Sequence, residues 1–292
     1  MDEAHGAHLG LFEGWPQSAV QLGADLVVQS SHKTLPSLTQ TALLHLGKNS
    51  LAAPEEVERQ LDIFETSSPS YPLLASLDGC TGILSEQGQE LFSRWKTTLD
   101  RFSMIVRPLK NLRVLCHGAD NKSLHTDIFD FDPSKLVVST AGTDFTGTSL
   151  AKVLRCKFCF ETEMACGPIT LAMTSAADDP DAVLRFAKAL LELDIQADKC
   201  PVLFPPALPK PSKSVFTIGT ALLKPTLDLP LSKAAGSISG EYIWAYPPGV
   251  PLIAPGEVVG PEFAATASAL MQSGTTLHHS HCKKPDSIHV LT

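Results

Sequence analysis

Residues 23–46, GADLVVQSSHKTLPSLTQTALLHL, decide the fold. The apolar run of residues 26–28 lies between a turn glycine and two serines, which is typical of a buried strand in a parallel sheet. Lys33 follows that strand directly. Because parallel α/β sheets place their chemistry at the carboxyl ends of strands, we predict an α/β fold with a functional lysine at position 33.

The chain opens with MDEAHGAHLG, which places Asp2 31 positions before Lys33. That interval allows one strand–helix–strand step, which would bring the acid and the lysine to the same sheet edge. Such a pair suits pyridoxal phosphate: the lysine forms a Schiff base with the aldehyde, and the acid keeps the pyridine nitrogen protonated. The hydroxyls and imidazole of residues 30–32 suit the phosphate group.

Other functions are weighed against this one. Residues 2–5 spell the DEAH box of helicases, but the sequence has no GxxxxGK[ST] phosphate loop, and its net charge of −8 argues against a nucleic-acid partner. Asp2, His5 and His8 are a metal-ligand alternative. The CxxC of residues 156–159 lacks a second pair, and we interpret the HHxHC run of residues 278–282 as a solvated tail. We predict no metal site.

The composition is that of a globular protein, with 43% hydrophobic and 18% charged residues. No apolar run reaches the about 18 residues of a membrane span, so no membrane partner is expected. Met1 begins no signal-peptide pattern. The seven scattered cysteines are typical of reduced thiols, and we expect an intracellular, cytoplasmic protein. An organellar location stays open if a transit peptide precedes Met1.

The remaining elements are predicted from periodicity, capping and turn residues. Residues 142–147 are expected to be a loop, five prolines within residues 201–211 a stiff linker, and the polar tail after Ser273 frayed. The predicted helices are residues 54–64, 85–104 (capped by Ser85) and 180–194, and the predicted strands are residues 135–140 and 168–175.

Five stretches together resemble the Orn/Lys/Arg decarboxylase family, pyridoxal phosphate enzymes that decarboxylate basic amino acids. The resemblance runs in order to about residue 260. The stretches are DEAHGAHLGLF (2–12), GADLVVQSSHKTLPSLTQTALLHL (23–46), TSSPSYPLLASLD (66–78), DPSKLVVSTAGTDFTG (132–147) and AYPPGVPLIAPGE (245–257).

The resemblance implies three domains. Residues 1–132 would be the C-terminal part of a fold-type-I transferase large domain with a mainly parallel sheet. Residues 133–203 would be a small α+β domain, and residues 204–292 the family's C-terminal α+β domain with a polar tail. Residues 66–71 would lie near a dimer interface, since this family completes its site from both subunits of a homodimer or higher oligomer.

The resemblance also implies the role of each site residue. Lys33 would be the Schiff-base lysine, Asp2 would pair with the pyridinium nitrogen, and His5 would reach the phenolic oxygen side of the cofactor. Glu241 is a candidate for meeting the substrate's distal charge. The other cofactor-binding residues would be Ala4 on one ring face, and Ser30 and His32 at the phosphate.

The implied function is decarboxylation of arginine, lysine or ornithine to the amine and CO2, as in polyamine metabolism. The family's cofactor domain begins before the DEAH segment, so we expect the chain alone to bind pyridoxal phosphate weakly and to need another chain. Two non-enzymatic alternatives are an inactive fragment and a dimerisation partner that regulates a full-length homologue. A fold-type-I aminotransferase is the enzymatic alternative.

Overall fold

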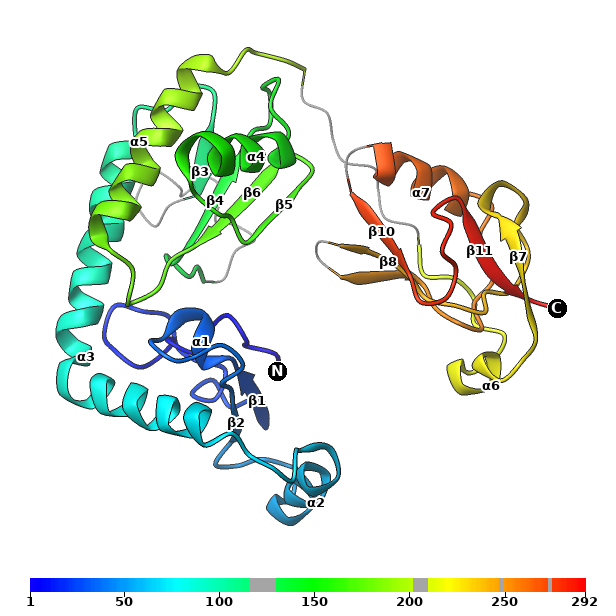
Figure 1. The fold of residues 1–292 in the computed structure, drawn as a ribbon, viewed down its shortest axis with the longest axis horizontal. Helices are drawn as coiled ribbons and strands as arrows, with labels where there is room; N and C mark the ends of the chain where they lie inside the picture. Colours follow the sequence, from blue (N-terminus) through cyan, green and yellow to red (C-terminus); the bar gives the residue numbers. More distant parts are fainter. Residues whose placement is uncertain (116–129, 202–209, 247–248, 273–274) are drawn as a thin grey trace. The chain divides into compact units, whose positions relative to one another are not determined.

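The computed structural model describes residues 1–115, 130–201, 210–246, 249–272 and 275–292. Within these ranges the chain is a mixed α/β protein whose defined strand registers are antiparallel (Figure 1). Two compact units are present. The first comprises Met1–Lys110, Val114–Val137 and Ala172–Gln196, and the second Asn111–Arg113, Val138–Leu171 and Ala197–Thr292.

The segment that contains Lys33 is a two-stranded ribbon in the first unit. The predicted strand is confirmed as β1 (Leu26–Gln29), but it pairs antiparallel with β2 (Leu43–Leu46). The connection between the two strands contains the single helical turn α1 (Ser31–Thr34) and then a loop to Ala42, so it forms no crossover helix and the chain returns as an antiparallel partner. The prediction of a mainly parallel sheet is therefore wrong for this ribbon.

Two helices follow the ribbon. α2 (Pro54–Phe64) has the predicted bounds, and α3 (Tyr71–Val106) is much longer than the predicted helix. Ser85 lies inside α3 and does not cap it. Gly79 and Gly82 lie within α3, and neither glycine has a neighbouring atom within 4 Å of an added Cβ. A glycine inside a helix costs about 1 kcal/mol relative to alanine, so α3 continues through both positions at a modest cost.

The core of the first unit lies between α3 and α5 (Pro180–Gln196), which run side by side (Figure 1). Both helices bury apolar residues at helical spacing. The rings of Phe102 and Phe186 stack with their centroids 6.0 Å apart. The buried side chains of α3 include Phe92, Trp95, Leu99, Phe102 and Val106, and those of α5 include Val183, Leu184, Phe186, Leu190 and Leu193.

A four-stranded sheet contains the two predicted strands of residues 135–140 and 168–175. Its order is β3-β4-β6-β5, and β5 and β6 pair antiparallel. The strands are β3 (Arg113–Leu115), β4 (Lys135–Ser139), β5 (Met164–Cys166) and β6 (Ile169–Met173).

α4 (Gly147–Phe158) begins where a loop was predicted. Thr146 caps it: its hydroxyl accepts from Ser149 N, and the Ser149 hydroxyl accepts from Thr146 N in return. A Cβ at Gly147 would lie 2.2 Å from the Ile169 carbonyl oxygen. Gly147 therefore allows the helix start to approach β6, which explains a glycine that the sequence alone presents as loop punctuation.

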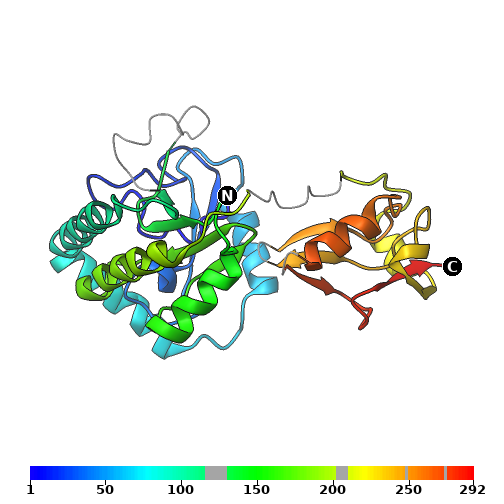
Figure 2. The ribbon, with the colours of Figure 1, turned by 90° about the horizontal axis from the view of Figure 1, so that it is seen from above.

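The C-terminal part of the second unit is built on two antiparallel sheets, β10-β8-β9 and β11-β7. α7 (Phe263–Gln272) lies across the strands, as Figure 2 shows. The buried core of this C-terminal part includes Ile243, Ile253, Val259, Phe263, Ile288 and Val290. The remaining elements are α6 (Ile218–Leu222), β7 (Thr226–Pro230), the 3-10 turn η2 (Leu231–Lys233), β8 (Ile243–Tyr246), β9 (Val250–Ile253), β10 (Thr276–His279) and β11 (Ser287–Leu291).

The chain end forms part of this core, so the prediction of a frayed tail is wrong. β10 pairs with β8, and β11 pairs with β7 and buries Ile288 and Val290. The alternation of apolar and polar residues in Ser287–Leu291 is a strand pattern. Most of the predicted proline linker lies outside the described residues. No helix in the described ranges has the length and apolarity needed to cross a bilayer.

Candidate active site

Lys33 is held by a short, well-anchored segment. β1 buries Val27 completely, and α1 begins two residues after Gln29. The side chains of Ser31 and Thr34 point into the protein, with exposures of 1% and 0%, while Lys33 is half-buried between them. Burial of the residues on either side fixes the direction in which the lysine points.

The DEAH segment lies along β1. Asp2 forms a parallel bridge with Val28, and Glu3 N donates to Val28 O at 2.9 Å. The Glu3 carboxylate also accepts from Gln29 Nε2 at 2.6 Å, so this acid serves the local fold. Ser30 N donates to Ala4 O at 3.3 Å. These contacts bring the backbones of residues 2–4 and 28–30 together, while the pairing of Asp2 and Lys33 in one site stays a prediction.

The side chain of Lys33 contacts that of His5. Lys33 Nζ lies 3.2 Å from His5 Nε2. Among the residues that the structure describes, Lys33 forms no ion pair with a carboxylate. An amine beside an imidazole can pass a proton to it, which is the arrangement of a nucleophile and its base.

A second layer of charged groups supports His5. Lys135 Nζ donates to the His5 carbonyl oxygen at 3.0 Å and to Asp132 Oδ2 at 2.8 Å. The other oxygen of Asp132 lies 3.2 Å from His8 Nε2. Burial acts to raise the pKa of Asp132, but the hydrogen bond and charge of His8 and the charge of Lys135 outweigh it and hold the pKa well below its usual range.

His8 is a buried part of this support and has no solvent exposure. Its ring lies against Trp15 and Trp95, with centroids 5.2 Å and 5.0 Å away. Asp2, His5 and His8 do not converge as a three-ligand group in the described chain. The metal alternative for these residues is therefore not supported, and His8 packs in an aromatic cluster.

The other predicted cofactor ligands lie around the same segment. Asp2 is exposed and its Oδ1 accepts from Ala4 N at 2.9 Å. His32 Nδ1 donates to the Thr41 carbonyl oxygen at 2.9 Å. The buried hydroxyls of Ser31 and Thr34 have no hydrogen-bond partner among the described residues. Two such orphaned groups on either side of Lys33 are costly unless something else satisfies them.

Glu241 lies in the second unit and is fully buried. Its Oε2 accepts from Cys282 N at 2.9 Å and from His281 N at 3.0 Å, and its Oε1 accepts from His289 N at 2.9 Å. Burial acts to raise its pKa, but His279 and these backbone donors lower it to about 2. This geometry favours a structural carboxylate, and the substrate-binding role stays a prediction.

Comparison with known proteins places these observations in a family. Residues 1–153 match the family model described as Orn/Lys/Arg decarboxylase, major domain. Residues 214–276 match the Orn/Lys/Arg decarboxylase, C-terminal domain. The chain belongs to the Orn/Lys/Arg decarboxylase family.

Curated relatives in this family include two named arginine decarboxylase. The one from Bacillus subtilis is 31% identical over 275 residues, which covers 90% of this chain and 53% of the relative. The one from Bacillus anthracis is 30% identical over 264 residues, covering 89% of this chain and 52% of the relative. The chain thus spans about half the length of the curated relatives that it matches.

Solved structures show the same fold. The constitutive lysine decarboxylase of Escherichia coli matches with a TM-score of 0.69 at 18% identity, over 91% of this chain and 49% of that chain. The lysine decarboxylase of Francisella novicida matches with a TM-score of 0.68, also at 18% identity, and covers the same shares. At this identity the likeness concerns the fold alone.

The support for His5 is what sequence reasoning missed in this decarboxylase family member. In the sequence, Asp132 precedes Pro133 and indicates a break in the chain, and Lys135 is the first residue of a predicted strand. Their spacing of three residues, DPSK, is the one signal available, because it lies inside a stretch that carries the family resemblance. His8 and Asp132 are 124 positions apart in the sequence, so no local pattern can indicate their contact.

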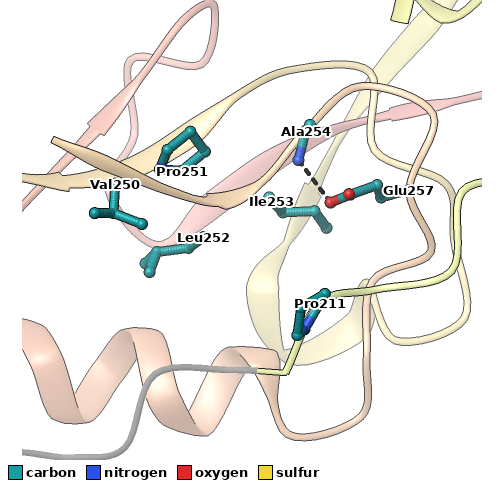
Figure 3. Close-up of a pocket in the computed structure, with 7 residues that line it drawn as sticks. All are labelled: Pro211, Val250, Pro251, Leu252, Ile253, Ala254 and Glu257. Carbon is teal, nitrogen blue, oxygen red and sulfur yellow. Dashed lines mark hydrogen bonds between the residues drawn. The ribbon is translucent and has the colours of Figure 1, made fainter. Parts of the chain in front are cut away.

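A hollow in the second unit contains none of the predicted site residues. It has a volume of about 240 Å³ and is open to solvent. Figure 3 shows the Glu257 carboxylate turned toward its rim, where Oε2 accepts from Ala254 N at 2.9 Å. Its lining is mostly apolar and consists of Pro211, Val250, Pro251, Leu252, Ile253, Ala254 and Glu257.

Proposed function

We propose that this chain contributes to a pyridoxal phosphate-dependent decarboxylase that converts a basic amino acid to its amine and CO2, as in polyamine metabolism. The observation that carries the proposal is the contact between Lys33 and His5, at the end of β1, in a member of this family. We also propose that residues 1–132 belong to a fold-type-I large domain, followed by the domains of residues 133–203 and 204–292.

The residues present suit the cofactor. Lys33 would bind its aldehyde, Asp2 would pair with its pyridine nitrogen, and His5 would lie on the side of its phenolic oxygen. Pyridoxal phosphate, when bound, supplies an electron sink for the pair of electrons left behind by CO2. The exposed carboxylate of Asp2 supports its role, since one oxygen accepts from Ala4 N and the other has no hydrogen bond with the residues that the structure describes.

The phosphate end has support from the orphaned hydroxyls of Ser31 and Thr34. A phosphate accepts hydrogen bonds from hydroxyl groups, and α1 presents these two beside the predicted ligands Ser30 and His32. We propose Ser30 and His32 as phosphate ligands and Ala4 as the residue that packs on one face of the ring.

His5 and Lys33 act together in the proposed reaction. His5 Nε2 holds or takes a proton from Lys33 Nζ, which makes the amine nucleophilic. Lys135 holds the backbone of His5 in place through its carbonyl oxygen, and Asp132 holds Lys135. The same pair of groups is available to return a proton to the substrate carbon after CO2 leaves.

The proposed substrate is a basic amino acid, and the names of the Bacillus relatives favour arginine. The test is the release of CO2 from labelled arginine, lysine and ornithine with added pyridoxal phosphate. The chain is measured alone and co-purified with the Bacillus subtilis relative, because a second copy of this chain and a longer relative are the two candidate partners. We expect CO2 release that is lost with Lys33→Ala and retained with Lys48→Ala, an exposed lysine nearby.

Three other outcomes contradict the proposal or redirect it. Formation of an oxo acid instead of CO2 identifies an aminotransferase. CO2 release that survives Lys33→Ala assigns the reaction to the relative. Suppression of the relative's activity by the added chain identifies a regulatory partner.

The regulatory alternative has one observation in its favour. Val28, Leu44 and Leu46, which share one face of the β1–β2 ribbon, are between 37% and 44% exposed. An apolar patch of this kind is typical of surfaces that another polypeptide covers. Size-exclusion chromatography of the mixture tests it: a mixed oligomer supports the alternative, and separate elution contradicts it. A homodimer is proposed on the same basis.

A further inference from the structure

Three metal-ligating side chains converge in the second unit, far along the sequence from Lys33. Asp228 lies on β7 and His289 on β11, and the two residues face each other in the antiparallel register. His289 Nε2 lies 2.7 Å from Asp228 Oδ1. Cys282, in the connection between β10 and β11, brings its sulfur so that all three ligand atoms lie within 4.8 Å of one another.

The donor types suit zinc. Zinc binds thiolate sulfur, imidazole nitrogen and carboxylate oxygen, and three protein ligands leave one tetrahedral position for water. A thiol in the set disfavours magnesium and calcium, which prefer oxygen ligands. Cys282 is 6% exposed, Asp228 is exposed and His289 is half-buried, so the group lies at the surface with its sulfur inward.

The histidine is oriented by a second partner. His289 Nδ1 lies 3.4 Å from the hydroxyl of Thr226, which lies on β7 two residues before Asp228. Thr226 and Asp228 thus engage the two ring nitrogens, and a metal at Nε2 would take the place of the Nε2 proton while Thr226 holds Nδ1. Metal-ligating histidines are commonly held in this way by an outer group.

Glu241 fixes the backbone of two of the three ligands. Its carboxylate accepts from the backbone N–H groups of Cys282 and His289, each at 2.9 Å, and is fully buried. One side chain thereby ties the connection between β10 and β11 to β11. The sulfur and the imidazole are held at their positions before any metal binds, which reduces the ordering cost of binding.

We propose that Asp228, Cys282 and His289 form a zinc site that ties the β10–β11 connection to the β7–β11 ribbon. On binding, the Cys282 thiol releases its proton to solvent and the sulfur binds as thiolate, with no change of oxidation state. The site is independent of the proposed decarboxylase chemistry, and its test needs no activity.

The experiment is a cobalt(II) titration of the metal-free chain, followed by displacement with zinc. The Cys156→Ser/Cys159→Ser background removes the exposed CxxC thiols, which would otherwise bind cobalt. We expect one bound cobalt with a thiolate charge-transfer band in the near ultraviolet and the visible bands of tetrahedral cobalt. Zinc should displace the cobalt and abolish both sets of bands.

Variants assign the ligands. Cys282→Ser should remove the charge-transfer band, and Asp228→Asn and His289→Gln should each weaken zinc binding about tenfold or more, because even outer-sphere partners contribute that much. Cys200→Ser, at an exposed thiol outside the group, should change neither. Circular dichroism checks that each variant is folded. If Cys282→Ser does not fold, Asp228→Asn replaces it as the variant that tests the site.

Two results would overturn the proposal. One is the absence of a thiolate band at saturating cobalt in the folded parent chain. The other is cobalt binding that is unchanged by Asp228→Asn and His289→Gln, which would place the metal elsewhere.

Discussion

Each unit of the molecule contains a carboxylate with a depressed pKa, half-buried Asp132 in the first and buried Glu241 in the second, and the two are stabilised differently. Asp132 in the first unit is held by the side chains of His8 and Lys135. Glu241 in the second unit is held largely by backbone N–H groups, with His279 at a longer 3.5 Å. Side-chain charges can be exchanged or moved, whereas backbone donors are fixed. The comparison therefore suggests that the network of Asp132 serves the function and that of Glu241 serves the fold.

The largest effect is expected from Glu241→Gln. The amide nitrogen would face backbone N–H donors, and the charge-assisted hydrogen bonds to Cys282 and His289 would be lost. We expect a loss of about 3 kcal/mol in the free energy of unfolding. Urea unfolding monitored by Trp244 fluorescence in the second unit measures it. A loss below about 1 kcal/mol would contradict a structural role and favour the predicted substrate-binding role.

Asp132→Asn should have the next largest effect. The variant leaves His8 and Lys135 without their anion, and we expect a loss of about 2 kcal/mol. Lys135→Met should lower the free energy of unfolding less in the Asp132→Asn background than in the parent chain, because the Lys135 ammonium has already lost its carboxylate partner there. Additive losses in this double-mutant cycle would show that the two residues are not coupled.

The pH dependence of stability distinguishes the two carboxylates. Both folded pKa values are depressed, so each carboxylate stabilises the fold above its unfolded pKa, and the contribution is lost as pH falls. For Glu241 the loss should run from about pH 4.3, the ordinary value, down to about 2. For Asp132 it should begin below about pH 3.9 and continue further into acid.

Unfolding curves of the parent chain and Glu241→Gln at a series of pH values test this dependence. The variant should lose the part of the acid destabilisation that runs from about pH 4.3 downward. Equal acid sensitivity of the two proteins would contradict the assignment.

The smallest effect is expected from Asp228→Asn in the metal-free chain. Asp228 is about half exposed, with a side-chain exposure of 53%, and its pair with His289 is a surface ion pair. Such pairs contribute about 0.5 kcal/mol or less. With zinc added, the difference between parent and variant should grow, because a ligand that binds only the folded state stabilises it. Chemical unfolding with and without zinc measures both values, and a large metal-free loss would contradict the surface assignment.

Much of the first unit could be predicted from sequence. The apolar run of β1 and the stripe of α3 are local patterns, and both are present. The bounds of α2 follow from its proline and acidic first turn. The antiparallel partner of β1 could not be predicted. Residues 43–46, LLHL, show no alternation of apolar and polar residues, and no turn motif indicates that the chain reverses direction after α1.

The second unit shows where local patterns fail. The histidines of residues 278–282 resemble a polar tail, but His278 and His279 pair with Trp244 and Ile243 of β8, which lie far from them in the sequence. Asp228 and His289 are opposed by strand pairing, and no spacing in the sequence announces their contact. The Glu241 carboxylate is buried because backbone N–H groups at three distant positions donate to it, and the sequence around Glu241 gives no sign of those donors.

The central claim is that Lys33 is the reactive lysine of this chain. The direct measurement is borohydride reduction in the presence of pyridoxal phosphate, followed by peptide mass spectrometry, on the chain alone and on the chain co-purified with the Bacillus subtilis relative. The contact with His5 predicts that Lys33 is modified well ahead of the exposed Lys48, and that His5→Ala reduces this preference. Modification of Lys33 and Lys48 to the same extent in both preparations would contradict the claim.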